Sequence, residues 1–165
     1  MPKFKIEFYL NLIFLLSLLA IITAYFIQYV LGYQPCNLCI IERIPYALSL
    51  FILTINFIFK KNEKVFVLLL IFIFIFSLMI SIYHLGIEQG FFKESFICNL
   101  QSGADIVSKE ELLKELQKKI VSCKDVTFKI FGFSLTSINI VSNLFIIILL
   151  TKIFITYEKF KKKDR

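Results

Sequence analysis

Three long stretches of this sequence contain no charged side chain. With histidine taken as neutral, they cover residues 8–31, 65–87 and 130–151. Each exceeds the roughly 20 residues that a helix needs to cross a hydrocarbon core about 30 Å thick. A fourth apolar stretch, residues 44–59, is shorter and must extend towards residue 40, through Glu42 and Arg43, in order to cross. The sequence therefore predicts four membrane-spanning helices.

We predict an all-α protein, a four-helix transmembrane bundle that forms one integral membrane domain over residues 1–165. The helices are expected at about residues 8–31, 40–59, 65–87 and 130–151. Composition agrees with this class, because 58% of the residues are apolar and the mean hydropathy is +0.80, whereas soluble domains are usually less than half apolar.

The net charge of +7 does not indicate nucleic-acid binding, because the basic residues lie at the ends of apolar stretches and form no aromatic-interleaved basic face. Segments 1–7, 60–64 and 152–165 are rich in Lys and Arg, whereas the loop 88–129 has seven Lys and seven acidic residues. By the positive-inside rule, both termini are cytoplasmic, and the loops 32–39 and 88–129 lie on the outer side.

The second outer loop contains one further expected element. Ser108 to Glu111 reads as a capping box that begins a helix. The apolar residues that follow fall on one face: Leu112, Leu113, Leu116 and Ile120. We expect a short amphipathic helix that lies along the lipid surface or packs on the outer mouth of the bundle.

All four cysteines fall on the predicted outer side, where disulfides form and persist. Cys36 and Cys39 form a C-x-x-C motif in the first loop, and Cys98 and Cys123 lie in the second. Cys36 precedes an apolar helix, whose N-terminus favours a thiolate. Arg43 follows Cys39 by four residues and shares its helix face. A guanidinium there would stabilise a Cys39 thiolate or a neighbouring anion.

Three interpretations of the cysteines compete. A purely structural role suits the spaced pair, but a C-x-x-C disulfide closes too small a loop to add much stability. A zinc site with four cysteines usually has two C-x-x-C knuckles, and the second pair is too widely spaced for one, so we expect no metal. A redox relay, with one labile and one fixed disulfide, suits both pairs and is favoured.

The segment from Gln34 to Tyr46, QPCNLCIIERIPY, resembles the signature of the bacterial disulfide-bond formation protein B (DsbB) family. The layout of helices and cysteines is similar, as are residues 83–88 and the stretch from Cys123 to Leu135. The resemblance implies a membrane thiol oxidase of the bacterial inner membrane. This family keeps the periplasm oxidising with a quinone as the electron sink, here ubiquinone or menaquinone, and its partner is a periplasmic thioredoxin-fold dithiol oxidase (DsbA-like).

The resemblance also implies roles for individual residues. Cys98 would form the mixed disulfide with the partner, and Cys123 would be its disulfide mate. Electrons would then pass to Cys36 and Cys39, with Cys39 facing the quinone and Arg43 holding a quinone oxygen. The chain has no Trp, so aromatic contacts with a quinone must come from Phe or Tyr.

His84, the only histidine, is expected near the outer end of the third helix. It would either adjoin the quinone and supply protons or simply hydrogen-bond a loop. Glu42 is expected to neutralise Arg43, and Glu88 to be a helix-end charge. The polar face of the fourth helix, formed by Thr136, Asn139 and Asn143, is expected to make interhelical hydrogen bonds.

Two other functions stay open at this point. The first is a non-catalytic membrane protein whose outer loops are joined by structural disulfides. The second is a thiol reductase that runs electrons outward, as in the vitamin K epoxide reductase family, although the C-x-x-C of that family belongs to a late helix.

Overall fold

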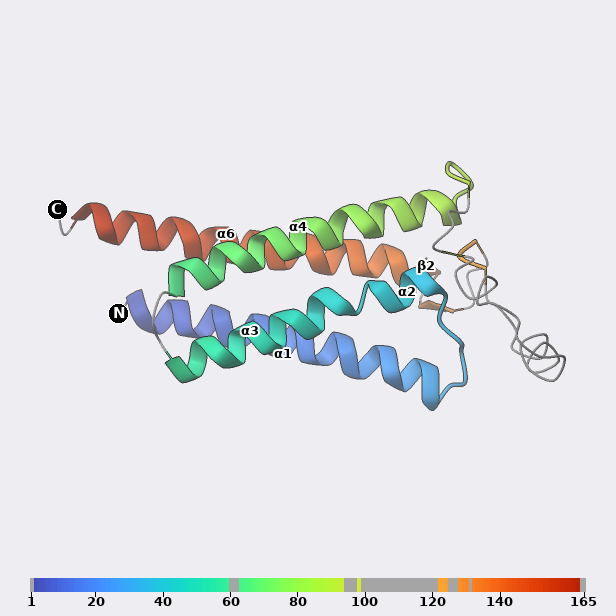
Figure 1. Ribbon diagram of the computed structural model, residues 1–165, viewed down its shortest axis with the longest axis horizontal. Helices are drawn as coiled ribbons and strands as arrows, with labels where there is room; N and C mark the ends of the chain where they lie inside the picture. Colours follow the sequence, from blue (N-terminus) through green and yellow to red (C-terminus); the bar gives the residue numbers. More distant parts are fainter. Residues whose placement is uncertain are drawn as a thin grey trace, which may run out of the picture.

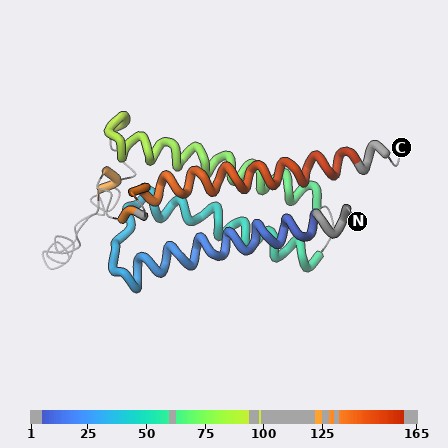
Figure 2. Tube along the Cα trace, turned by 180° about the vertical axis from the view of Figure 1, so that it is seen from behind, coloured from blue at the N-terminus to red at the C-terminus, as the bar shows by residue number. Residues whose placement is uncertain are grey.

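Four long helices run side by side along the length of the molecule (Figure 1). The computed structural model describes residues 2–59, 63–93, 98, 122–124, 128–130 and 132–163. The long helices are α1 (Pro2–Tyr29), α3 (Ile44–Phe59), α4 (Glu63–Glu88) and α6 (Leu135–Lys163). The start of α1 and the end of α6 lie at the same end of the bundle (Figure 2). The short helix α2 (Asn37–Ile41) lies at the other end, which is called the cysteine end below.

Within the described residues, four segments are long and apolar enough to cross a membrane: Ile6–Tyr29, Asn37–Phe59, Glu63–Glu88 and Leu135–Lys159. Without water, a lipid-exposed backbone must satisfy its own hydrogen bonds, and a helix does so within one segment. The protein is therefore a multi-pass membrane protein, and the predicted all-α four-helix bundle is confirmed. The predicted amphipathic helix of the second outer loop lies outside the described residues.

The second span is built from two helices rather than one. α2 ends at Ile41, and α3 begins at Ile44. Pro45 has no N–H with which to bond the carbonyl of Ile41, so the helical ladder is interrupted there. Hydrogen bonds from Glu42 N to Leu38 O and from Ala47 N to Arg43 O carry the chain across the break. The break lies at Glu42 and Arg43 and lets these neighbours point in different directions.

The last helix begins later than the apolar pattern suggested, at Leu135 rather than near residue 130. Residues Lys129–Ile130 (β1) and Phe133–Ser134 (β2) form a small antiparallel hairpin in which Lys129 is opposite Ser134. Gly132 in its turn has a φ of +86°, a left-handed conformation that favours glycine. A right-handed helix cannot run through such a residue, so α6 begins after it. Ser134 then caps α6, because its Oγ accepts a hydrogen bond from Ser137 N.

The bundle has two kinds of interior. Towards the chain termini, apolar side chains from all four long helices form the main core, which includes Ile13, Leu53, Phe74 and Leu150. At the cysteine end, a second cluster contains Cys36, Leu38, Ile87, Cys98 and Cys123. α4 packs along α6 and α1 packs along α3. Polar side chains buried between these two regions connect the helices.

Candidate functional site

The C-x-x-C pair is a closed disulfide at the start of α2. Cys36 and Cys39 are bonded to each other, and Cys36 is the N-cap residue of the helix. The N–H of Cys39 donates to the Cys36 sulfur at 3.2 Å. A reduced Cys36 would keep this N–H at a helix N-terminus, an arrangement that favours the thiolate. Cys36 is almost fully buried, at 6% exposure.

The second disulfide, between Cys98 and Cys123, lies directly beside the first. Both of its cysteines are only 2% exposed, and they pack in one cluster with Cys36. The side-chain amide of Asn37, next to Cys36 in the sequence, donates to the carbonyl of Cys98 at 3.2 Å. The structure therefore brings all four cysteines together, although more than 80 residues separate the first from the last.

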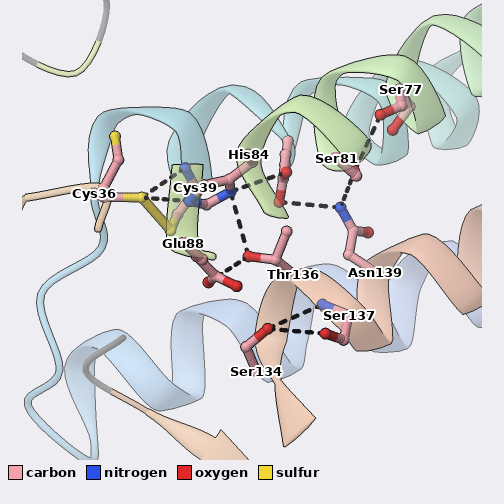
Figure 3. A network of polar contacts seen from close by, with 12 residues as sticks. Cys36, Cys39, Ser77, Ser81, His84, Glu88, Ser134, Thr136, Ser137 and Asn139 are labelled. Atoms are coloured by element: carbon pink, nitrogen blue, oxygen red, sulfur yellow. Dashed lines mark hydrogen bonds and ion pairs between the residues drawn. A yellow bond between two sulfur atoms is a disulfide. The ribbon is translucent and has the colours of Figure 1, made fainter. Parts of the chain in front are cut away.

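His84 links the C-x-x-C disulfide to a buried carboxylate. Its Nε2 lies 3.5 Å from the Cys36 sulfur, and its Nδ1 lies 3.1 Å from Glu42 Oε1. The ring is 1% exposed and Glu42 is 8% exposed. Figure 3 shows His84 between the disulfide and the α6 side chains. The sequence left open whether His84 forms a hydrogen bond with a loop. Within the described residues it contacts Cys36 at the start of α2, Glu42 in the α2–α3 turn and Thr136 of α6.

Glu42 and His84 belong to a longer polar network that crosses the bundle (Figure 3). Asn139 donates to Glu42 Oε2 at 3.1 Å and to Ser81 Oγ at 2.9 Å. Thr136 lies 3.3 Å from His84 Nδ1 and donates to Glu88 Oε1 at 2.8 Å. The expected interhelical hydrogen bonds of the α6 polar face are therefore present. They hold the Glu42 and His84 side chains in one orientation.

A cavity of about 360 Å³ lies beside this network, between α1, the α2–α3 turn and α6. Its lining is mainly apolar and includes Leu16, Leu19, Ala20, Ile27, Leu135 and Ile138. Its polar lining includes Cys39, Glu42, Arg43, Thr136 and Asn139. Ligand sites usually combine a mostly apolar surface of this size with a few fixed polar groups.

Arg43 is fixed by α1 rather than by Glu42. Its Nη1 donates to Gln28 Oε1 at 2.5 Å, and its guanidinium carbon lies 5.1 Å from the centroid of the Tyr25 ring. Glu42 instead faces His84 and Asn139. The expectation that Glu42 only neutralises Arg43 is therefore wrong. Adjacent residues of a helix do not face each other, and the side chains of Glu42 and Arg43 extend in different directions. The Arg43 guanidinium and the Glu42 carboxyl group therefore reach different parts of the cavity.

The sulfurs of Cys36 and Cys39 and a nitrogen of His84 lie within 4.8 Å of one another, a spacing that would suit a metal ion. However, a metal binds the thiolate, and both sulfurs belong to a disulfide. The oxidised site therefore offers no thiolate ligand, and the described geometry is that of a disulfide beside a histidine ring.

Two features were missed by sequence reasoning. Glu42 carried no signal beyond its place next to Arg43. Gly86 lies within residues 83–88, which were considered only for their resemblance to the DsbB family. A Cβ at this position would lie 2.3 Å from the Phe92 ring. This ring stacks on Tyr83, next to His84. Gly86 thus lets Phe92 cover the helix that carries His84. Only a close-packed structure reveals such a requirement.

Comparison with known proteins identifies the family. The family model described as "Disulfide bond formation protein DsbB" matches residues 7–153. The uncharacterized protein RP370 of Rickettsia prowazekii (strain Madrid E) is 31% identical over 146 residues, which cover 86% of this chain and 84% of that protein. No solved structure matches the chain. The chain therefore belongs to the DsbB family of membrane thiol oxidoreductases that act in disulfide-bond formation.

Proposed function

We propose that this protein is a quinone-linked thiol oxidase. It takes two electrons from a periplasmic, DsbA-like dithiol oxidase and passes them through both cysteine pairs to a quinone in the bilayer. One observation carries the proposal: Cys39 lines the cavity together with Arg43, and its mate Cys36 belongs to the buried cluster that contains Cys98 and Cys123. Both cysteines of the C-x-x-C pair contact this cluster, and of the two only Cys39 also lines the cavity.

This arrangement supports a proposed order of electron transfer. A thiolate of the partner attacks Cys98, and Cys123 leaves as a thiolate. The second thiolate of the partner then releases the oxidised partner from Cys98. The reduced Cys98–Cys123 pair next reduces the Cys36–Cys39 disulfide by the same exchange chemistry. Each exchange transfers two electrons: the disulfide of the accepting pair opens, and a disulfide forms in the donating pair.

The cavity suits a quinone head group. A quinone is an apolar ring with two carbonyl oxygens, and it accepts two electrons and two protons when it is bound beside a dithiol. Leu19 and Ile138 line the cavity and are exposed apolar residues of membrane-spanning segments, which supports access for a molecule dissolved in the bilayer. Arg43 offers N–H donors to an oxygen. The aromatic pair Tyr33 and Phe128, with ring centroids 4.9 Å apart, lines the outer part.

We propose that the chain lies in a bacterial inner membrane with its cysteine end in the periplasm and both termini in the cytoplasm. The Lys- and Arg-rich segments at the terminal end support this orientation. In this orientation the cysteine pairs are on the same side of the membrane as a soluble periplasmic partner. The orientation also places the cavity at a depth that a membrane quinone reaches.

The proposal is tested in bacterial cells that lack their own quinone-linked thiol oxidase. We expect the wild-type chain to restore the oxidised form of the periplasmic dithiol oxidase, as measured by trapping free thiols with an alkylating reagent. Cys36→Ser should accumulate to the wild-type level but leave the partner reduced. If Cys36→Ser oxidises the partner normally, the relay is wrong. If the mutant protein disappears from the membrane, the disulfide has a structural role instead.

A further inference from the structure

Two protons, as well as two electrons, must leave the C-x-x-C pair in each cycle. The reduced pair carries one proton on each sulfur, and closing the disulfide releases both. Cys39 lines the cavity and can release its proton there directly. Cys36 does not line the cavity and is 6% exposed. Its proton therefore needs a separate path through the protein.

The described contacts contain one such path. From the Cys36 sulfur it is 3.5 Å to His84 Nε2. From His84 Nδ1 it is 3.1 Å to Glu42 Oε1, and Glu42 lines the cavity. Proton transfer requires groups within hydrogen-bond reach, and a sulfur contact is longer than an oxygen contact. The three side chains therefore form a continuous connection from the buried sulfur to the cavity.

The hydrogen-bond partners of His84 determine which ring nitrogen carries the proton. Glu42 Oε1 can only accept a hydrogen bond from Nδ1 when the carboxylate is ionised. Thr136 directs its own proton to Glu88 Oε1 at 2.8 Å, so its oxygen also accepts from Nδ1. Both neighbours thus place the proton on Nδ1. The lone pair of Nε2 is then directed to Cys36, as a base for its thiol requires.

From this geometry we propose that His84 and Glu42 form an internal proton relay from the Cys36 thiol to the cavity. The relay rests on the proposed function, because it assigns the second proton of the thiol oxidase cycle. His84 Nε2 takes the proton of Cys36, His84 Nδ1 passes its proton to Glu42, and Glu42 releases it into the cavity. Loss of the proton from Nε2 and gain of one on Nδ1 then restore the starting tautomer of His84, with no net change in protons, before the next cycle.

The step balances without a proton from bulk water. Two S–H bonds break, one S–S bond forms, and two electrons with two protons move to the quinone. The electrons leave through Cys39, and the two protons leave by separate routes, one from Cys39 and one through Glu42. A carboxylate buried to 8% exposure without an Arg or Lys partner among the described contacts is costly. A proton-carrying role gives this buried carboxylate a function.

Among the described residues, three side chains contact the ring nitrogens of His84. Cys36 comes from the start of α2, Glu42 from the α2–α3 turn and Thr136 from α6. Glu88 of α4 is reached only through Thr136. Glu88 therefore supplies a matched control, because Glu88→Gln removes a nearby carboxylate charge without breaking the path from Cys36 to Glu42.

The first test needs neither quinone nor turnover. In the full-length chain, Cys39, Cys98 and Cys123 are replaced by Ser, so that Cys36 is the only thiol, and its ultraviolet thiolate absorbance is followed between about pH 5 and about pH 10. We expect His84→Gln to lower the thiolate fraction of Cys36 at neutral pH by about tenfold. Glu42→Gln should lower it by a smaller factor. Glu88→Gln should stay within about twofold, since it lies outside the path.

The second test separates a relay from a structural or purely electrostatic effect. In the otherwise wild-type chain, Glu42→Gln should slow quinol formation while thiol exchange with the partner keeps its rate. Glu42→Asp should restore part of the loss, because it retains a carboxylate. Thermal unfolding of each variant should match that of wild type.

Three results would overturn the relay. The first is an unchanged Cys36 titration in His84→Gln. The second is a normal rate of quinol formation in Glu42→Gln. The third is an equal loss in Glu88→Gln and Glu42→Gln, which would mean that charge alone matters. Failure of the proposed function looks different, because wild type would then form no quinol although the coupling between Cys36 and His84 would still be seen in the single-thiol protein.

Discussion

Replacement of Arg43 by Met should weaken quinone binding without unfolding the protein. The guanidinium is held by Gln28 and the Tyr25 ring and lines the cavity. A hydrogen bond from a charged donor contributes about 1.5–3 kcal/mol. Its loss corresponds to a rise in KM for quinone of about 10- to 100-fold, since about 1.4 kcal/mol is a factor of ten.

The assay is quinol formation by purified protein in lipid nanodiscs, measured over a range of quinone concentrations with a saturating dithiol donor. Arg43→Lys keeps the charge but loses the planar fork, so its KM should lie between those of wild type and Arg43→Met. Lys64→Met removes a cation that pairs with Glu158 at the opposite end of the bundle and should leave KM unchanged. A KM for Arg43→Met within twofold of wild type would refute a role for Arg43 in holding the quinone.

Three further predictions concern packing and the order of the relay. Gly86→Ala should lower the free energy of unfolding by about 1–3 kcal/mol, because the new Cβ collides with Phe92. Denaturant unfolding in detergent measures this loss, and an unchanged midpoint would contradict the predicted collision. Asn143→Leu should lower the free energy of unfolding by about 1–2 kcal/mol, since it removes contacts with three side chains of α3 and α4. A more stable variant in the same assay would show that these contacts are not favourable. The double variant Cys98→Ser, Cys123→Ser should still let quinone reoxidise a chemically reduced C-x-x-C pair, but should accept no electrons from the protein partner. Stopped-flow mixing with each reactant separates the two steps, and electron uptake from the partner at the wild-type rate would place the second pair outside the relay.

The class of fold could be predicted because the bilayer leaves few options. Uncharged stretches of sufficient length must become helices when no water is available to the backbone. The short fourth stretch was expected to continue through Glu42 and Arg43, and α2 and α3 together provide that length. The start of α6 was less predictable, because an apolar pattern does not reveal the left-handed turn at Gly132 or the cap at Ser134.

The site was only partly accessible from the sequence. The spacing of Cys36, Cys39 and Arg43 indicated redox chemistry, and the structure places Cys39 and Arg43 on one cavity. Which cysteine pairs with which could not be derived from spacing, since four cysteines allow three pairings. The partner of Glu42 was missed because charge signs suggest the adjacent Arg43, whereas the break before Pro45 turns the two side chains towards different helices.

The position of His84 shows why depth in the membrane is a weak guide to contact. The sequence predicted His84 near the outer end of the third helix, and His84 and Arg43 both lie at the cysteine end. Yet His84 is not among the residues that line the cavity, and it reaches the cavity through Glu42 and Thr136. Side-chain direction on α4, set by packing against α2 and α6, decides this difference.

The most direct test of the central claim is quinol formation by the purified protein supplied with a reduced, thioredoxin-fold dithiol oxidase. The number of quinol molecules formed is compared with the number of disulfides formed in the partner, for wild type and for Cys39→Ser. We expect one quinol for each partner disulfide in wild type and none in Cys39→Ser. Consumption of quinol, or no quinol with either ubiquinone or menaquinone, would contradict the account.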